Sequence, residues 1–277
     1  MMTHEFSVLL SLYDRESPLY LNECFESLYE QTLQAPEIVL VLDGEISDKL
    51  QLVINEWKDR INIKIVPISK NVGLSKALNY GLKYCTHELV FRMDTDDICC
   101  ENRFEVQYDY MMKNIDIDIC GSFSQDISEK GELLSIRKKP LEHDSILKLL
   151  WTNPFIHPSV VFRKTKIESI GSYNYNAPHR HDDYELWIRA ANLGCVFANI
   201  PTPLIKYRVP LDPYSKTKVK DRINTFKLGY KVIWKYDRRI VAYIGLLYPI
   251  IRSVLPKRAK KVIARIVSKF DPRDKWY

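Results

Sequence analysis

The first 93 residues alternate short apolar runs with segments whose apolar residues recur at helical spacing. The mainly apolar runs, which we predict to be strands, are Phe6–Leu12, Glu37–Leu42, Ile61–Pro67 and Glu88–Met93. Between the first two runs, for example, Leu21, Cys24, Phe25 and Leu28 fall on one side of a helix. Strands that alternate with helices through short connections predict an α/β fold, in which a doubly wound, mainly parallel sheet is flanked by helices.

Three carboxylates follow the fourth predicted strand directly, at Asp94, Asp96 and Asp97. Open α/β sheets bind ligands at the carboxyl ends of their strands, which is where these acids should lie. Crowded carboxylates raise one another's pKa unless a cation lies among them. A divalent ion held by carboxylates and by substrate phosphates would resolve the repulsion. The alternative is structural, because acids also stabilise the start of a helix, and 103–113 is predicted to be helical.

Two other strand–helix junctions carry candidate ligand-binding groups. Asp43 ends the second strand, where it could accept a hydrogen bond from a ribose hydroxyl or an imide, or form a turn with Gly44. In Asn71–Asn79 a turn leads into a helix. Gly73 there could serve chain geometry alone, or the first amides of the helix and Lys76 could face a diphosphate.

Asp182 and Asp183 begin a predicted helix over 182–193. They could complement the helix dipole, or one of them could act as a base beside a sugar hydroxyl. His157 precedes a predicted strand; a lone histidine in that place is usually structural, and a functional role is the alternative. The chain has no P-loop, no G-x-G-x-x-G and no serine–histidine–acid elbow, which disfavours NTPase, dinucleotide-binding and hydrolase functions.

In this order, the motifs resemble those of the inverting glycosyltransferases of family 2, which have the GT-A fold. The resemblance covers about residues 5–208. The matching segments are Ser7–Tyr13, Glu37–Gly44, Asn71–Leu82, Phe91–Ile98, Arg103–Gln107, His157–Val160 and Asp182–Arg189.

The resemblance implies roles for individual residues. Asp183 matches the general base, and Asp96 would hold Mn²⁺ or Mg²⁺ between the two phosphates of a UDP-sugar. The other expected donor-binding residues are Tyr13, Asp43, Lys76, Arg92 and Asp94. Residues expected near the acceptor or a phosphate are His157, Asp182, Trp187 and Arg208. The family commonly has Glu-Asp where this chain has Asp182-Asp183, which leaves the base position intact. Many members also carry a histidine or serine loop after Tyr207-Arg208; 209–215 lacks it, so no late phosphate or metal ligand is assigned.

The implied activity is transfer of a hexose from a UDP-sugar to a lipid-diphosphate-linked saccharide, with inversion to a β-glycosidic bond. Such a reaction belongs to O-antigen or capsule synthesis. The alternatives are a membrane-bound, non-catalytic sugar-nucleotide-binding module and a sugar nucleotidyltransferase. The second alternative is disfavoured because the loop Tyr13–Pro18 contains no glycine.

Charge is distributed unevenly along the chain. Residues 216–277 hold 18 Lys and Arg against 4 Asp and Glu, whereas residues 1–215 carry a net charge of −8. We therefore expect a catalytic domain at 1–215 and a basic amphipathic helical region at 216–277 that lies on an anionic membrane surface. A helix packed on the domain or on a partner subunit, as in a homo-oligomer, is the alternative. No motif for nucleic-acid recognition accompanies the basic region.

The remaining features predict a cytoplasmic protein attached peripherally to the inner face of the plasma membrane. The first residues lack a signal-peptide pattern. The six cysteines have no zinc-site spacing, and several lie in apolar segments typical of buried free thiols. The longest apolar stretch, Ile240–Ile251, is too short to span a bilayer as a helix.

Overall fold

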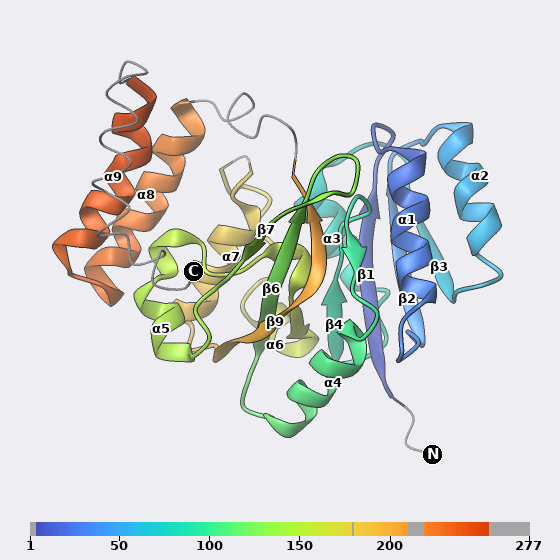
Figure 1. The fold of residues 1–277 in the computed structure, drawn as a ribbon, viewed down its shortest axis with the longest axis horizontal. Helices are drawn as coiled ribbons and strands as arrows, with labels where there is room; N and C mark the ends of the chain where they lie inside the picture. The colour runs from blue at the N-terminus through green and yellow to red at the C-terminus, as the bar shows by residue number, and fades with distance from the viewer. Residues whose placement is uncertain (1–3, 179, 210–218, 255–277) are drawn as a thin grey trace.

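The computed structural model describes residues 4–178, 180–209 and 219–254. Within them, one sheet has the strand order β3-β2-β1-β4-β8-β6-β9-β5, and β7 pairs with β6 (Figure 1). The strands are β1 (Phe6–Leu12), β2 (Glu37–Asp43), β3 (Ile63–Ile68), β4 (Leu89–Arg92), β5 (Ile98–Cys99), β6 (Ile119–Ile127), β7 (Leu133–Arg137), β8 (Val161–Arg163) and β9 (Phe197–Arg208).

Helices connect these strands and cover both faces of the sheet. The α-helices are α1 (Pro18–Tyr29), α2 (Asp48–Trp57), α3 (Leu74–Leu82), α4 (Arg103–Lys113), α5 (His143–Lys148), α6 (Lys164–Ser169), α7 (Asp182–Asn192), α8 (Val219–Tyr236) and α9 (Ile240–Val254). Two short 3₁₀ helices are η1 (Leu150–Thr152) and η2 (His157–Ser159).

The N-terminal half of the sheet is the predicted parallel half. β1 pairs in parallel with both β2 and β4, and β2 pairs in parallel with β3. All seven residues of β2 are buried, because helices cover both faces of a parallel sheet. The unbroken apolar runs in the sequence are the direct consequence of this burial.

The second half of the sheet is mixed, and the sequence predicts it less well. β8 is antiparallel to β4 and β6, whereas β9 is parallel to β6 and antiparallel to β5. The twelve-residue β9 is not apparent in the sequence, because Pro201 and Pro203 interrupt its pattern. Prolines cannot donate to a ladder, and the β6–β9 register is irregular near Pro203.

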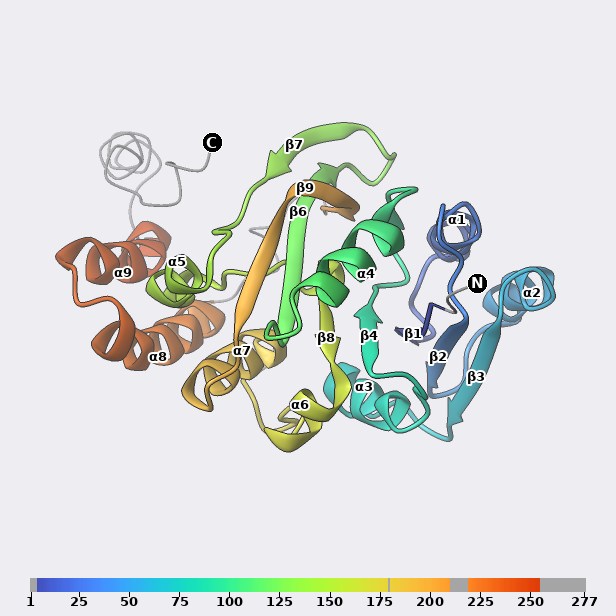
Figure 2. The same ribbon diagram turned by 90° about the horizontal axis from the view of Figure 1, so that it is seen from below.

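Two hydrophobic clusters sandwich the sheet. One contains buried residues of α1, α2 and α4, and the other contains buried residues of α3, α6, α7, α8 and α9. Figure 2 shows α1 and α4 on one face and α3, α6 and α7 on the other. This arrangement confirms the predicted α/β architecture and leaves the strand ends free to carry polar groups.

α8 and α9 form a helical pair at the end of the molecule opposite α2 (Figure 1). This pair packs against the rest of the protein. Trp151 of η1 donates a hydrogen bond from Nε1 to Oδ2 of Asp237, which lies between the two helices, at 3.1 Å. Leu246 of α9 is buried. The predicted boundary at 215/216 and residues 255–277 of the basic region lie outside the described residues. Among the helices within the described ranges, none is both long enough and apolar enough to cross a bilayer.

The packing of α9 against Trp151 predicts a stability effect at Gly245. A Cβ at this position would lie 2.5 Å from the Trp151 ring. We expect Gly245→Leu to lower the free energy of unfolding by about 1–3 kcal/mol through overpacking, measured by urea denaturation. Ile244→Leu, on the exposed side of the same helix, should change it by less than about 0.5 kcal/mol. Equal effects of the two substitutions would contradict this packing.

Candidate active site

The acidic loop between β4 and β5 brings three carboxylates together. Oxygens of Asp94, Asp96 and Asp97 lie within 4.8 Å of one another. Burial, together with the charges of Asp94 and Glu16, raises the pKa of Asp96 to about 7. Burial and the two neighbouring acids also raise the pKa of Asp97 well above its usual value. Repulsion of this kind is relieved when a cation binds.

The chemistry of this cluster fits a divalent cation. All of its side-chain ligands are carboxylate oxygens, which Mg²⁺ and Mn²⁺ prefer. Asp97 Oδ2 is buried and has no hydrogen-bond partner among the described residues. The sequence singled out Asp96 as the metal ligand, and the structure places carboxylate oxygens of Asp94 and Asp97 within 4.8 Å of one of its own.

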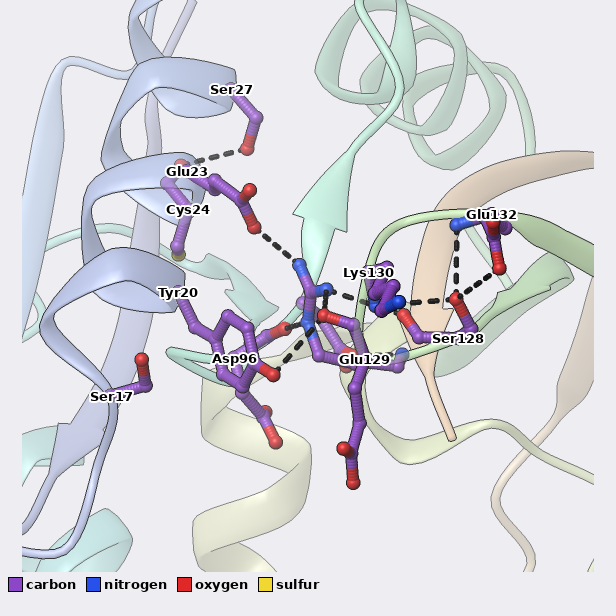
Figure 3. A network of polar contacts seen from close by, with 12 residues as sticks. Ser17, Tyr20, Glu23, Cys24, Ser27, Asp96, Ser128, Glu129, Lys130 and Glu132 are labelled. Carbon is purple, nitrogen blue, oxygen red and sulfur yellow. Dashed lines mark hydrogen bonds and ion pairs between the residues drawn. The ribbon is translucent and has the colours of Figure 1, made fainter. Parts of the chain in front are cut away.

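Arg208, the last residue of β9, forms hydrogen bonds to the acidic loop. Its backbone N–H donates to Asp97 Oδ1 at 2.8 Å, and its Nε donates to the backbone oxygen of Asp96 at 2.9 Å. The same guanidinium donates to Glu23 Oε2 on α1 and to backbone oxygens of Ser128 and Glu129 (Figure 3). Arg208 is therefore buried among protein partners. Its geometry favours positioning of the acidic loop over the phosphate contact that the sequence suggested.

Arg92 lies beneath Asp94 and forms an ion pair with it. The residue is only 1% exposed, and its Nε and Nη1 have no hydrogen-bond partner among the described residues. Its backbone oxygen accepts a hydrogen bond from the buried Arg103 at 2.8 Å. Arg103 thus supports the end of β4. Gln107, in the same predicted motif, donates a hydrogen bond to the backbone oxygen of Ser159.

A cavity of about 890 Å³ opens beside these groups. It joins elements that are far apart in the chain, from the loop after β1 to the start of α7. Of the predicted residues, those lining it are Tyr13, Lys76, Arg92, Asp94, His157, Asp182 and Asp183. Asp96 lies next to Asp94 at the acidic loop. The structure therefore brings the predicted acids and the predicted base into one region.

A second cavity, of about 550 Å³, adjoins the first through Tyr13. Asp43 lines this second cavity together with Asp14, Arg15 and Asn71. The Asp43 carboxylate accepts hydrogen bonds from the amides of Val72 and Gly73 at 2.6 and 3.0 Å. These two backbone amides therefore bind Asp43. The sequence had left open whether the amides at this turn face a diphosphate instead.

His157 lies at the surface of the cavity, whereas Trp187 is buried in the core. His157 lines the cavity, and its Nε2 lies 2.8 Å from the Tyr173 hydroxyl. Burial and the Arg92 cation hold the pKa of His157 well below its usual value, so the imidazole is neutral. Trp187 is fully buried behind His157, with ring centroids 6.0 Å apart. Its geometry favours a core role over the acceptor contact that the sequence suggested.

Asn153 is a site residue that the sequence did not reveal. Its Nδ2 donates to Asp183 Oδ2 at 3.0 Å, and its backbone oxygen accepts from Lys139 Nζ at 2.7 Å. Its φ of 57° is left-handed, a conformation that costs a non-glycine residue free energy. Asn153, Lys139 and Arg137 all line the first cavity. The only sequence signal was Asn followed by Pro154, which by itself indicates a turn.

Comparisons with known proteins agree with this geometry. The sequence model described as "Glycosyl transferase family 2" matches residues 7–171. The amylovoran biosynthesis glycosyltransferase AmsE of Erwinia amylovora is 40% identical over 95% of this chain and 98% of its own length. An Escherichia coli relative, named UDP-Gal:alpha-D-GlcNAc-diphosphoundecaprenol beta-1,3-galactosyltransferase, is 38% identical over 96% of this chain and 98% of its own.

Solved structures share the fold. S. aureus TarS 1–349 in complex with UDP matches 90% of this chain and 71% of its own with a TM-score of 0.65 and 17% identity. At this identity the likeness establishes the fold alone. The sequence matches lead to one conclusion: the chain belongs to glycosyl transferase family 2.

Proposed function

We propose that this protein transfers a hexose from a UDP-sugar to a lipid-diphosphate-linked saccharide, with inversion to a β-glycosidic bond, in the synthesis of a surface polysaccharide. The observation that carries the proposal is the single cavity that Asp94 and Asp183 line together, beside Asp96. The names of the Erwinia amylovora and Escherichia coli relatives support it. A non-catalytic module would not need a base opposite the acidic loop.

The nucleotide would occupy the second cavity, with Tyr13 against the uracil and Asp43 near the ribose. The diphosphate would then reach the acidic loop, where Lys76 and Arg92 supply positive charge from the wall of the first cavity. A Mg²⁺ or Mn²⁺ ion held by Asp96 and its neighbours would act as a Lewis acid toward the leaving diphosphate. Asp94 would contact the ribose or the sugar.

Asp183 would act as the general base. Asn153 holds one oxygen of its carboxylate, which leaves the other to accept the proton of the acceptor hydroxyl. As that proton moves, the hydroxyl oxygen forms a bond to the anomeric carbon from the side opposite the diphosphate. The bond between that carbon and UDP breaks with its electron pair on the phosphate oxygen. A single displacement therefore inverts the anomeric centre.

Substitutions of the two key carboxylates test this mechanism. Asp183→Asn should lower kcat by about 10²–10⁴-fold, because it removes the base with little change of shape, and UDP binding should persist. Asp96→Ala should lose transfer as well as the stimulation by Mn²⁺ or Mg²⁺. Product formation and calorimetric UDP binding are the measurements, with the exposed Asp116→Asn as control. Full turnover of either variant would refute its assigned role.

Asn153 provides a separate test of how the base is oriented. Asn153→Gly tolerates the left-handed backbone but removes the hydrogen bond to Asp183, whereas Asn153→Ala also adds backbone strain. A hydrogen bond to a charged group is worth about 1.5–3 kcal/mol. We therefore expect both variants to lose about tenfold or more in kcat, with little change in the KM for UDP-sugar. If Asn153→Gly keeps the original kcat, Asn153 does not orient the base.

We also infer that α8 and α9 attach the protein to the inner surface of the plasma membrane. Ile240, Ile244, Leu247 and Ile251 are exposed and follow one another at intervals of four, three and four residues, so they share one side of α9. On α8, Tyr230 and Trp234 are also exposed. Residues 219–254 contain eight Lys and Arg but two Asp. Such a surface suits the interface of an anionic bilayer.

This surface can be tested without removing α9, which also packs on Trp151. The double variant Ile240→Glu/Ile244→Glu should bind vesicles containing anionic phosphatidylglycerol several-fold more weakly in sedimentation assays, because it places charges in the apolar stripe. Ile115→Glu, at a residue 74% exposed between α4 and β6, is the matched control. Unchanged vesicle binding by the double variant would exclude this attachment surface.

A further inference from the structure

One wall of the first cavity carries cations that the proposed mechanism does not use. Arg137 is the last residue of β7, and Lys139 follows it by two positions; both line the cavity. Lys76, in contrast, lines the cavity from the start of α3. Positive charge thus reaches the cavity from several elements, since Arg92 of β4 and Arg180 before α7 line it as well. The reaction proposed above involves two diphosphates, one on the donor and one on the acceptor.

Arg137 is fixed in a way that leaves one donor group available. Its Nε and Nη2 donate to Asp126 Oδ2 at 3.1 and 2.7 Å, and its guanidinium lies 4.8 Å from the centre of the Tyr207 ring. Nη1 makes no hydrogen bond to a described residue, and the side chain is 33% exposed. A guanidinium held in place in this manner is well suited to bind phosphate oxygens.

Lys139 lies close to the proposed base. Its Nζ donates to the backbone oxygen of Asn153, whose side chain donates to Asp183. A single residue therefore separates the ammonium group from the carboxylate. When a hydroxyl of the acceptor sugar contacts Asp183, the group on the anomeric carbon of that sugar lies within the width of one sugar ring. Lys139 is suitably located to meet a negative charge there.

The strand that leads to these cations is apolar and exposed. Leu133, Leu134 and Ile136 are 62%, 58% and 44% exposed, and among the described residues β7 pairs only with β6. Exposed apolar edge strands favour association with other surfaces. In chain order, the apolar residues of β7 come first, Arg137 and Lys139 follow, and Asn153, which hydrogen-bonds the proposed base, comes last. A lipid-linked acceptor has the same order of lipid, diphosphate, sugar and nucleophilic hydroxyl.

We propose that Arg137 and Lys139 bind the diphosphate of the lipid-linked acceptor, with Leu133, Leu134 and Ile136 facing the first part of its lipid. The inference rests on the proposed function and assigns its second substrate to one wall of the cavity. The donor diphosphate would lie at the acidic loop and Lys76. The two diphosphates would thus bind to different elements, with the transferred sugar and the acceptor sugar between them.

The experiment compares Lys139→Ala with Lys138→Ala, a neighbouring lysine that does not line the cavity. Each protein is given the same acceptor saccharide in two forms, one on a lipid diphosphate and one on an uncharged alkyl chain. For Lys139→Ala we expect the KM for the diphosphate acceptor to rise about tenfold. The KM values for the alkyl acceptor and the UDP-sugar should remain close to those of the unaltered protein. Lys138→Ala should leave all three unchanged.

Arg137→Lys provides a second variant that keeps the charge next to Asp126. It should also raise the KM for the diphosphate acceptor, because lysine lacks the planar donor pair of arginine. Equal losses with both acceptors would overturn the proposal in favour of a structural role. A raised KM for the UDP-sugar would overturn it in favour of the donor site. If the unaltered protein transfers sugar to neither acceptor, the proposed function itself is wrong, and the acceptor site fails with it.

Discussion

The repulsion among Asp94, Asp96 and Asp97 is the constraint on which the rest of the site depends. Three carboxylates this close cannot remain in a partly buried loop unless other groups hold its backbone in place. Arg208 does so from β9, through contacts to the backbone of Asp96 and to the Asp97 carboxylate. Arg92 and Arg103 hold the other end of the loop, one beneath Asp94 and one at the Arg92 backbone oxygen. Buried arginines thus offset the repulsion within the cluster of carboxylates.

This constraint explains why the two halves of the sheet contribute different chemistry. The parallel half delivers the acidic loop and the turn before α3, which lie at the carboxyl ends of its strands. The mixed half delivers Arg137, Lys139, Asn153 and Asp183, most of them from loops and helix starts. Because β8 pairs antiparallel with β4, the two halves are continuous at the cavity. Residues from both halves of the sheet therefore line one cavity.

The C-terminal helices α8 and α9 pack on the same core as α7, the helix that carries Asp183. Buried residues of α8 and α9 join the core cluster that also contains residues of α7, and His181 at the start of α7 lies 2.7 Å from Thr225 of α8. These contacts join the α8–α9 pair to the helix that carries Asp183.

The sequence alone determined the parallel half of the fold, since an apolar strand buried on both faces leaves an unbroken run such as 38–42. It also determined that acids would gather at the end of β4, and its resemblance to the family identified Asp183 as the candidate base. Only the tertiary structure could decide what Arg208, Trp187 and Asn153 do. Arg208 and Trp187 look like surface or site residues in a motif, yet their partners come from distant segments that bury them. Asn153 becomes significant only because long-range packing places its amide against Asp183, a contact across 30 residues that no local pattern encodes.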